Sequence, residues 1–344
     1  MTAPDPALAS DPAVSLLMRP GTGDFVDFPA SFGRRFMLVV DTEEEFDWDA
    51  PFNRESRDVT VTAGMQRAQD YFSGAGVKPL YVTDYPVIDD PRAGAMLAQW
   101  VADGVADVGA HCHPWVNPPH IEEVCARNSF AGNLPEASER QKIEALRDRI
   151  TAVVGHAPVA FRAGRYGIGP NSGQILRDLG FRVDTSVRSR FDYSAQHGPD
   201  FSGMSLRPYR AGPAKALLEL PLSTAWVGGL RGLGDHLLPV IEGRGLGAGA
   251  LARSGLLQRI PLTPEGVSIA EAIAAIDRLL ADGLDLLMFS FHSPTLEPGH
   301  TPYVRSGRDL DDFYRWWDAI LAHMAKRGVP PVGLDEVIVA AGLQ

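Results

Sequence analysis

The segment Phe36–Trp48 reads FMLVVDTEEEFDW and joins a predicted buried strand to an acidic terminus. Its first five residues form an unbroken apolar run, which is typical of a parallel strand whose two faces are both covered. Five carboxylates follow within seven positions: Asp41, Glu43, Glu44, Glu45 and Asp47. So many like charges at the end of a strand repel one another unless a cation or solvent screens them. The segment therefore predicts either a metal site or a solvated acidic turn.

Downstream of this strand, one pattern recurs: an amphipathic stretch, a glycine, and a short apolar run that ends on a polar residue. The pattern predicts strands over 79–82, 105–110, 158–161, 181–183, 217–222 and 284–291, with a last one around 331–334. It predicts helices over 59–72, 91–101, 138–154 with a Ser138–Gln141 capping box, 170–179, 268–280 and 310–326.

Alternating strands and helices imply a parallel sheet, and seven or eight repeats in about 300 residues favour a closed barrel over an open sheet. No glycine-rich phosphate-binding loop follows the first strand, which argues against a nucleotide-binding sheet. The predicted fold class is therefore α/β, a distorted (β/α) barrel of the TIM-like kind with seven or eight parallel strands. Residues 1–34 lack periodicity and are predicted to be a flexible N-terminal arm. Residues 35–344 are predicted to be a single barrel domain, with an elaborated insertion at about 189–264.

Net charge, cysteine count and the N-terminal residues limit the kinds of partner and the location that are expected. The net charge of -11 argues against a nucleic-acid surface and against adhesion to anionic lipid, so a small or neutral substrate is expected. Cys112 and Cys125 are the two cysteines of the chain, too few for a disulfide framework. The N-terminal residues show no charged segment followed by a long apolar run, which predicts no membrane insertion and a cytoplasmic location.

Polar residues that end successive strands are expected to meet at one mouth of a barrel, because the C-terminal ends of parallel strands converge there. A carboxylate from Asp41 or Glu43, together with His111 and His113, supplies three ligands and leaves a position open, as in catalytic metal sites. Histidines at i and i+2 on a strand face the same side, which favours chelation of one ion. A single core histidine at position 111 is the alternative interpretation.

Five separated blocks of the sequence resemble the motif series of polysaccharide deacetylases, the NodB-homology group of carbohydrate esterase family 4. They run in the family's order from about position 36 onward: DTEEEFDW, HCHPW, FRAGRYG, VDTSV and LLMFSFHSP. The chain most resembles the bacterial WalW-like subgroup, which is associated with surface-polysaccharide synthesis. The resemblance implies a NodB-type distorted barrel of seven or eight strands.

The resemblance also implies roles in the first two blocks. Asp41 would be the general base, and Glu43 the acidic metal ligand. His111 would be a second ligand. In the family the two histidines are separated by three residues, whereas HCHPW separates them by one. His113 is therefore the expected third ligand, with His120 as a weaker candidate.

The remaining blocks would complete the site. By the resemblance, Arg162 orients the base, Tyr166 lines the oxyanion site through its backbone N–H, and His292 is the general acid. A carboxylate beside His292 would raise its pKa, and Asp184 in the fourth block is a candidate for that neighbour. Trp115, next to the histidine pair, is a candidate for stacking on a sugar ring, and packing in the core is the alternative interpretation.

The implied activity is hydrolysis of an N-acetyl group on an amino sugar in a bacterial surface polysaccharide or its precursor, so a carbohydrate is the expected partner. A divalent metal, Zn²⁺ by default with Fe²⁺ left open, lowers the pKa of its bound water. Asp41 takes the proton as that water attacks the acetamide carbonyl, and His292 protonates the leaving amine. Two alternatives are a metal-dependent hydrolase of a small non-peptide amide and a catalytically inactive glycan-binding barrel. A complete set of base, ligands and acid argues against the inactive barrel.

Overall fold

The computed structural model describes residues 15–236 and 255–343. Within them, eight strands form one curled sheet in the order β10-β1-β2-β3-β4-β5-β7-β6, with every neighbouring pair parallel except β6 and β7. The strands are β1 (Arg35–Thr42), β2 (Leu80–Thr83), β3 (Asp107–Cys112), β4 (Ala160–Ala163), β5 (Val183–Asp184), β6 (Tyr209–Ala211), β7 (Leu217–Glu219) and β10 (Leu286–His292). Seven of them are therefore mutually parallel, and the predicted distorted (β/α) barrel is confirmed.

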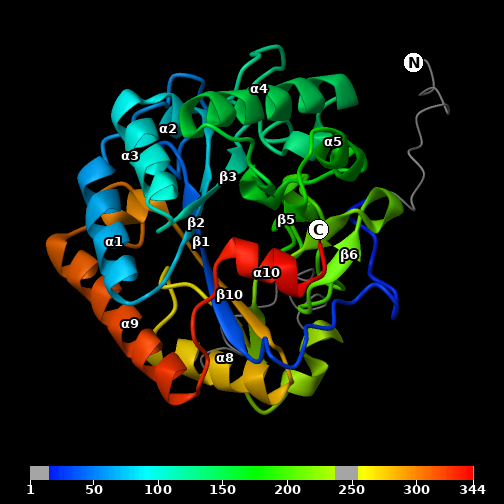
Figure 1. Cartoon of the computed structure of the whole chain (residues 1–344), viewed down its shortest axis with the longest axis vertical. Coiled ribbons are helices and arrows are strands. Elements are labelled where there is room, and N and C mark those ends of the chain that lie inside the picture. The colour runs from blue at the N-terminus through cyan, green and yellow to red at the C-terminus, as the bar shows by residue number, and fades with distance from the viewer. Residues whose placement is uncertain (1–14, 237–254, 344) are drawn as a thin grey trace.

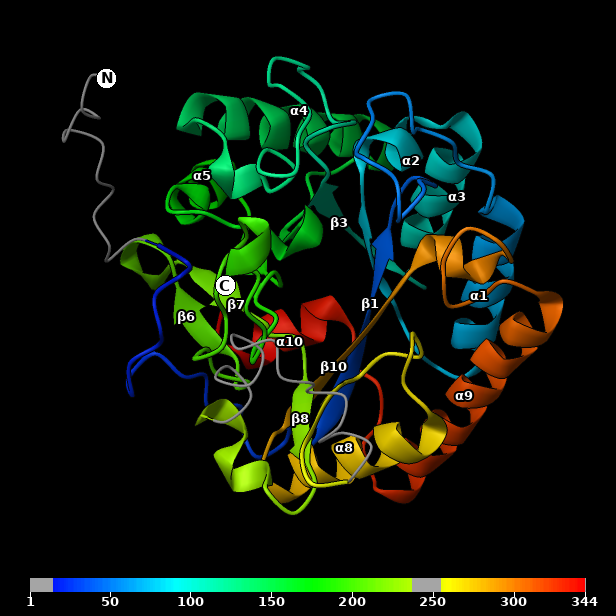
Figure 2. The ribbon, with the colours of Figure 1, turned by 180° about the vertical axis from the view of Figure 1, so that it is seen from behind.

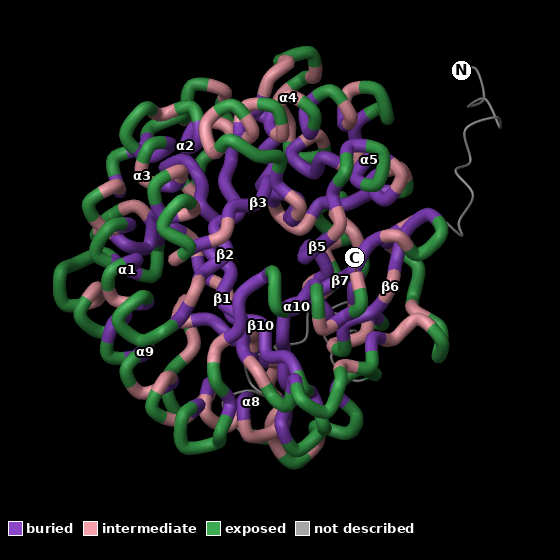
Figure 3. Tube along the Cα trace, in the orientation of Figure 1, coloured by how far each residue is buried: buried purple, intermediate pink, exposed green. Residues whose placement is uncertain are grey.

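Helices surround the sheet, as Figures 1 and 2 show from opposite sides. They are α1 (Thr62–Gly74), α2 (Tyr85–Asp89), α3 (Pro91–Ala102), α4 (Glu136–Val154), α5 (Ser172–Asp178), α8 (Ile269–Ala281) and α9 (Gly307–Lys326). Figure 3 shows buried strands in the middle of the molecule and exposed residues on the outer sides of the helices. None of the helices in the described ranges is long and apolar enough to cross a membrane.

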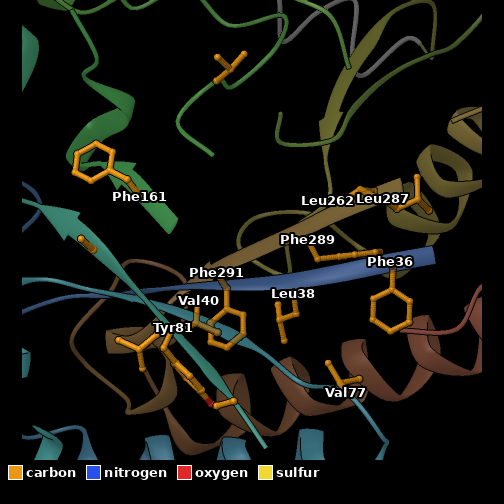
Figure 4. Packing of buried hydrophobic residues seen from close by; sticks show 14 of the residues in the cluster. Phe36, Leu38, Val40, Val77, Tyr81, Phe161, Leu262, Leu287, Phe289 and Phe291 are labelled. Carbon is orange, nitrogen blue, oxygen red and sulfur yellow. The ribbon is translucent and has the colours of Figure 1, made fainter. Parts of the chain in front are cut away.

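The side chains of β1 alternate between two apolar clusters. Phe36, Leu38 and Val40 pack outward in the cluster that contains residues of the surrounding helices (Figure 4). Met37 and Val39 point the other way, into the cluster inside the curled sheet. This period of two is what a strand with both faces covered requires. Because Asp41 continues this alternation after Met37 and Val39, its side chain also faces the inside of the barrel.

One end of the barrel interior is covered by α10 (Leu334–Ala340), which crosses the middle of the view in Figure 1. Its buried residues Val337 and Ile338 belong to the inner cluster with Met37 and Val39. The backbone N–H of Leu334 donates to Asp107 Oδ2, at the first residue of β3. The helix thus covers the N-terminal ends of the strands, and the opposite end holds the strand termini that carry polar residues.

A second, two-stranded sheet pairs β8 (Thr224–Val227) with β9 (Gln258–Pro261). The chain beside it contacts the edge strand β10: the Ser290 N–H donates to the Leu262 carbonyl at 3.1 Å, and the Met288 N–H donates to Ser223 Oγ at 2.9 Å. The described part of the predicted insertion 189–264 thus lies against an edge of the main sheet. Positions 237–254 of that insertion lie outside the described residues.

The N-terminal segment differs from the predicted loose arm. From position 15 it lies against the barrel: Leu16 is buried, and Phe25 forms a bridge with Tyr209. The Val26 N–H donates to the Pro208 carbonyl at 3.0 Å. These contacts are made by irregular chain, which carries no periodicity for a sequence pattern to reveal. Positions 1–14 of the predicted arm lie outside the described residues.

Two further local predictions are wrong. The expected strand around 331–334 is a single bridge between Pro331 and Phe36, after which α10 begins. The helix predicted from Ser138 begins at Glu136, and Pro135 occupies its cap position without a side-chain hydrogen bond. A Ser-Glu pair forms a capping box at the start of α8 instead, between Ser268 and Glu271.

Candidate active site

Three buried ligand atoms converge at the C-terminal ends of β1 and β3. Glu43 Oε2 lies 3.4 Å from His113 Nε2 and 3.7 Å from His111 Nε2. The three groups are 2–3% exposed, and Glu43 Oε1 is buried without a hydrogen-bond partner among the described residues. A buried carboxylate oxygen is rarely left unpaired, so the cluster fits a bound cation. Two imidazoles with one carboxylate are a donor set suited to a divalent transition metal.

The other nitrogen of each imidazole is engaged. His111 Nδ1 donates to the Arg162 carbonyl at 3.1 Å, and His113 Nδ1 donates to Glu44 Oε2 at 2.7 Å. Each Nε2 therefore turns its lone pair toward Glu43, which is the orientation of a metal ligand with a fixed outer partner. Burial lowers the pKa of both histidines, that of His113 to about 4, so both are neutral at pH 7.

His113, rather than His120, is the second histidine that the structure brings to Glu43. His120 lies on an exposed loop, and its carbonyl accepts a hydrogen bond from Arg54 at 3.1 Å. The spacing of one residue between the histidines is compatible with convergence because His111 and His113 lie on the same side of the chain. Their ring centroids are 4.7 Å apart.

Glu44 is buried behind His113 and was not predicted as a site residue. It accepts from the indole N–H of Trp115 at 2.9 Å, and its own backbone N–H donates to Asp84 Oδ2 at 2.7 Å. Burial, together with the adjacent Glu43 charge, raises the pKa of Glu44 to about 8. Through its hydrogen bond with His113 Nδ1, Glu44 orients that imidazole from a position that solvent does not reach.

The rest of the acidic segment serves the fold. Glu45 accepts from the backbone N–H groups of Thr60 and Val61 at 2.6 and 2.8 Å, just before α1 begins. Asp47 is exposed. The alternative of a solvated acidic turn thus describes Asp47, whereas the other four carboxylates are buried.

Asp41 forms a buried ion pair with Arg162, whose Nη1 contacts Asp41 Oδ1. Arg162 is itself held by Thr185, with Nε donating to the carbonyl at 3.0 Å and Nη2 to Oγ1 at 2.9 Å. Burial acts to raise the pKa of Asp41, but the Arg162 guanidinium and the nearby histidines outweigh it and hold that pKa below its usual value. The second oxygen, Oδ2, lies 3.7 Å from His292 Nε2.

His292 ends β10 opposite Asp41 in the strand register, and its carboxylate neighbour is Glu265. Glu265 Oε2 lies 2.7 Å from His292 Nδ1, and Oε1 accepts the His292 backbone N–H at 2.9 Å. Burial favours the neutral imidazole, yet Glu265, Glu43 and Asp41 together raise the pKa of His292 to about 10. His292 therefore keeps its proton at neutral pH.

Asp184, the predicted neighbour of His292, is not near it. Val183 belongs to the inner cluster, so Asp184 points to the other face of the sheet, the side of its register partner Phe161. There it accepts from Ser186 Oγ at 2.6 Å and lies beside Glu219, its register partner on β7.

The two predicted substrate contacts differ in outcome. Tyr166 lines the cavity, with a backbone φ of 61° directly after Arg165 at 54°. Trp115 is 1% exposed and does not line it, because its ring stacks on His113 at 4.2 Å between centroids. The prediction of sugar stacking by Trp115 is therefore wrong. Trp48 does line the cavity and meets the His292 ring edge-on.

The cavity over these groups measures about 320 Å³. Besides the polar cluster, its walls contain the aromatic residues Phe46, Trp48, Tyr166, Tyr193 and Tyr303 and the arginines Arg165 and Arg188. Sequence reasoning missed Glu265, Tyr193, Tyr303 and both arginines as site residues. Glu265, Tyr193 and Tyr303 lie outside every quoted motif, whereas Arg165 lies within the FRAGRYG block and Arg188 directly follows VDTSV, so their positions beside these blocks were a signal that could have found them.

The sequence matches no protein-family profile and no curated relative. Solved structures similar to the chain include carbohydrate esterase family 4 polysaccharide deacetylases. A peptidoglycan N-acetylglucosamine deacetylase is 12% identical over 91% of this chain and 90% of its own, with a TM-score of 0.45. The peptidoglycan deacetylase PdaC from Bacillus subtilis is 11% identical over 90% and 92%, with a TM-score of 0.42. A family 4 pseudoenzyme from Bacillus anthracis is 10% identical over 88% and 65%, with a TM-score of 0.43. At such identities the likeness concerns the fold alone.

Proposed function

We propose that this protein is a metal-dependent hydrolase that removes an N-acetyl group from an amino sugar in a bacterial surface polysaccharide or its precursor, as the resemblance to the WalW-like deacetylases implies. The observation that carries the proposal is the grouping of three elements in one cavity. A buried ligand cluster of Glu43, His111 and His113 lies beside the ionised Asp41 and the protonated His292. Ligands, base and acid are the set that amide hydrolysis by a metal-assisted water requires.

The metal would be held by Glu43, His111 and His113. Zn²⁺ is the proposed ion because it accepts imidazole and carboxylate ligands, and Fe²⁺ is the second candidate. Such an ion, when bound, makes water acidic near neutral pH and polarises a carbonyl oxygen. The orphaned Glu43 Oε1 and the outward lone pairs of both Nε2 atoms are the features of this chain that fit the ion.

Asp41 is proposed as the base. Arg162 occupies its Oδ1, which leaves Oδ2 to accept a proton from the attacking water. The low pKa of Asp41 keeps it ionised and ready at neutral pH. Because Thr185 holds the guanidinium through two further hydrogen bonds, Arg162 fixes the orientation of the base and does not move with the substrate.

His292 is proposed as the acid. It carries a proton at neutral pH, and Glu265 holds its Nδ1, so Nε2 is the atom that donates to the leaving amine. Tyr166 is proposed to face the acetamide, with its backbone N–H toward the oxyanion. A cytoplasmic location, and therefore a precursor as substrate, is part of the proposal.

The test combines metal content by elemental analysis with release of acetate from N-acetylglucosamine oligomers. Wild type should hold close to one metal per chain and release acetate. Asp41→Asn should keep the metal and lose at least about 100-fold in rate. His111→Ala should lose the metal. His323→Ala, which removes an imidazole of α9 that pairs with Asp277 of α8, is the matched control and should change neither.

The alternatives predict different results. If the protein holds metal and hydrolyses small amides but releases no acetate from any glycan, the substrate is a small amide and not a sugar. Glycan binding without metal and without hydrolysis would overturn the hydrolase and leave a binding barrel.

A further inference from the structure

The side chain of Arg188 is a cavity-lining cation that has no acidic partner among the residues that the structure describes. Its Nη1 donates to the Tyr193 hydroxyl at 2.9 Å, and its guanidinium lies over the rings of Phe191 and Tyr166, 4.2 and 5.1 Å from their centroids. In the described part of the chain, no carboxylate forms an ion pair with it. The chain carries 43 acidic residues against 32 basic ones, so the lack of a partner is not a shortage of carboxylates.

Arg165 repeats this arrangement in the same cavity. It donates to Ser129 Oγ at 2.5 Å and to Gln196 Oε1 at 2.7 Å. Its guanidinium lies over the Phe130 ring at 4.1 Å and the Phe52 ring at 5.0 Å. Within residues 15–236 and 255–343 it too forms no ion pair. Both cavity arginines are therefore held by neutral groups and by aromatic faces.

This environment contrasts with that of Arg162, which pairs with Asp41. A guanidinium has five N–H donors, and Arg188 uses one of them on a side-chain acceptor among the described residues. Aromatic faces stabilise the cation without using its donors, because they contact the plane of the group and leave its edge free. A partly buried cation with free edge donors is well suited to a carboxylate or phosphate, which accepts two parallel hydrogen bonds.

The carboxylates of the cavity restrict where such an anion can lie. Asp41, Glu43 and Glu265 line the same space and repel a second negative group that approaches them. Arg188 and Arg165 enter from the segments that follow β5 and β4, two strands that β2 and β3 separate from β1 in the sheet. An anionic group bound to the arginines would thus turn the neutral acetamide toward Asp41 and His292.

We propose that Arg188, supported by Arg165, binds an anionic group, a carboxylate or a phosphate, of the sugar whose acetamide lies at the ligand cluster. The inference rests on the proposed function for the identity of the sugar. It narrows the substrate class from N-acetylated amino sugars in general to acidic or phosphorylated ones. Arg188 is a binding residue in this proposal and takes no part in bond making.

The test is calorimetric binding of three sugars with the same acetamido ring to the metal-loaded protein. They are N-acetylglucosamine, N-acetylglucosamine 6-phosphate and N-acetylglucosaminuronic acid. We expect one anionic sugar to bind at least about 10-fold more tightly than the neutral one, which is about 1.4 kcal/mol. The phosphorylated sugar and the uronic acid are measured separately, so the one that binds more tightly identifies the anionic group that Arg188 prefers. Equal binding of all three, or no measurable binding of any, overturns the inference.

Variants separate recognition from folding. Arg188→Gln should bring the anionic and neutral sugars within about 2-fold, and Arg188→Lys should keep part of the preference because charge remains while the planar fork is lost. Arg207→Gln is the matched control: Arg207 also lies over an aromatic ring, Phe25, but pairs with Asp27 outside the cavity. Unchanged metal content and thermal unfolding would show that Arg188→Gln is folded. A preference that survives in Arg188→Gln overturns the proposal.

The same sugars distinguish this inference from the proposed function. Acetate released equally from neutral and anionic sugars, in wild type and in Arg188→Gln alike, would overturn the inference and leave the deacetylase. Binding of an anionic sugar that depends on Arg188, without release of acetate from any of the three, would overturn the deacetylase and leave the anion site.

Discussion

Glu265 holds His292 through two atoms at once: Oε2 lies 2.7 Å from Nδ1, and Oε1 accepts the backbone N–H at 2.9 Å. Thr295 Oγ1 also donates to Glu265 Oε1, at 2.6 Å. The carboxylate is therefore fixed against the imidazole by three donors. This arrangement contributes, with Glu43 and Asp41, to the raised pKa of His292 and leaves Nε2 facing the cavity.

Glu265→Gln should move the alkaline limb of kcat to lower pH. Glu265 acts with Glu43 and Asp41 to raise the pKa of His292 to about 10, so loss of the Glu265 charge lowers that pKa and the acid form disappears at lower pH. We expect little change at pH 6 and a loss of at least about 10-fold at pH 9. The measurement is kcat for acetate release from pH 5 to 10. Thr295→Val is the control, since it removes the hydrogen bond to Glu265 Oε1 and keeps the charge of Glu265. A parallel fall in rate at all pH values in Glu265→Gln would contradict the prediction.

Glu44→Gln and Glu45→Gln form a matched pair of neighbours with different roles. Glu44 orients His113, so its amide variant should bind Zn²⁺ about 10- to 100-fold more weakly. Glu45 accepts two backbone N–H groups before α1, so its variant should keep metal affinity and lose about 1–2 kcal/mol of stability. Calorimetric Zn²⁺ titration and urea unfolding measure the two effects. Equal metal affinity in both variants would disprove the role assigned to Glu44.

Gly164→Ala should disturb the ligand cluster through sterics alone. A Cβ at this position would overlap the His113 ring and the Cys112 carbonyl oxygen. We expect at least about a 10-fold loss of Zn²⁺ affinity, because a displaced imidazole loses its alignment with Glu43 and Glu44. Gly74→Ala, where nothing lies within 4 Å of the added methyl, is the control and should leave affinity unchanged. If Gly164→Ala bound Zn²⁺ as tightly as wild type, the turn after β4 would have to shift enough to accommodate the added methyl group, and the prediction would be wrong.

Glu139→Gln should remove a pH dependence of stability that is unrelated to catalysis. Glu139 is 1% exposed, and burial raises its pKa to about 7 from the 4.5 of an exposed glutamate. A raised carboxyl pKa means that the folded state holds the proton longer, so stability falls as pH rises from about 4.5 to 7. The fall is about 3 kcal/mol.

The glutamine variant keeps an acceptor for Ser172 and does not ionise. It should therefore be more stable than wild type at pH 8 and nearly equal to it at pH 4.5. Urea midpoints at the two pH values measure the difference. Identical pH profiles for the two proteins would show that Glu139 ionises as freely when folded as when unfolded.

The barrel and its ligand cluster could be predicted because both follow from local patterns. The apolar run ending at Asp41 and the i, i+2 histidines each specify a side-chain direction within a few residues. Once parallel strands are inferred, their C-terminal ends must meet, which brings Glu43 and His111 together. These arguments need no knowledge of loop paths.

Other features depend on contacts that local patterns do not encode. Glu265 reaches His292 from an irregular segment 27 residues earlier, where neither spacing nor propensity marks it. Trp115 is adjacent to the histidines in sequence, which suggests a place in the cavity. Its ring is instead buried, and its indole N–H donates to Glu44, so it does not line the cavity. Nothing in the sequence indicates which face of the sheet Asp184 occupies. On the two-residue strand β5 its side chain faces away from the inner cluster and lies beside Glu219.

The register pair Asp41 and His292 joins the first strand of the sheet to the last of its parallel strands in sequence. During synthesis, Glu43, His111 and His113 have all left the ribosome once residue 113 has emerged, whereas His292, the proposed acid, follows some 180 residues later. Under the proposed function, a nascent chain therefore contains the proposed metal ligands well before it contains the proposed acid. Competence for hydrolysis would then mark the completion of the fold, since it requires the longest-range strand pairing of the sheet.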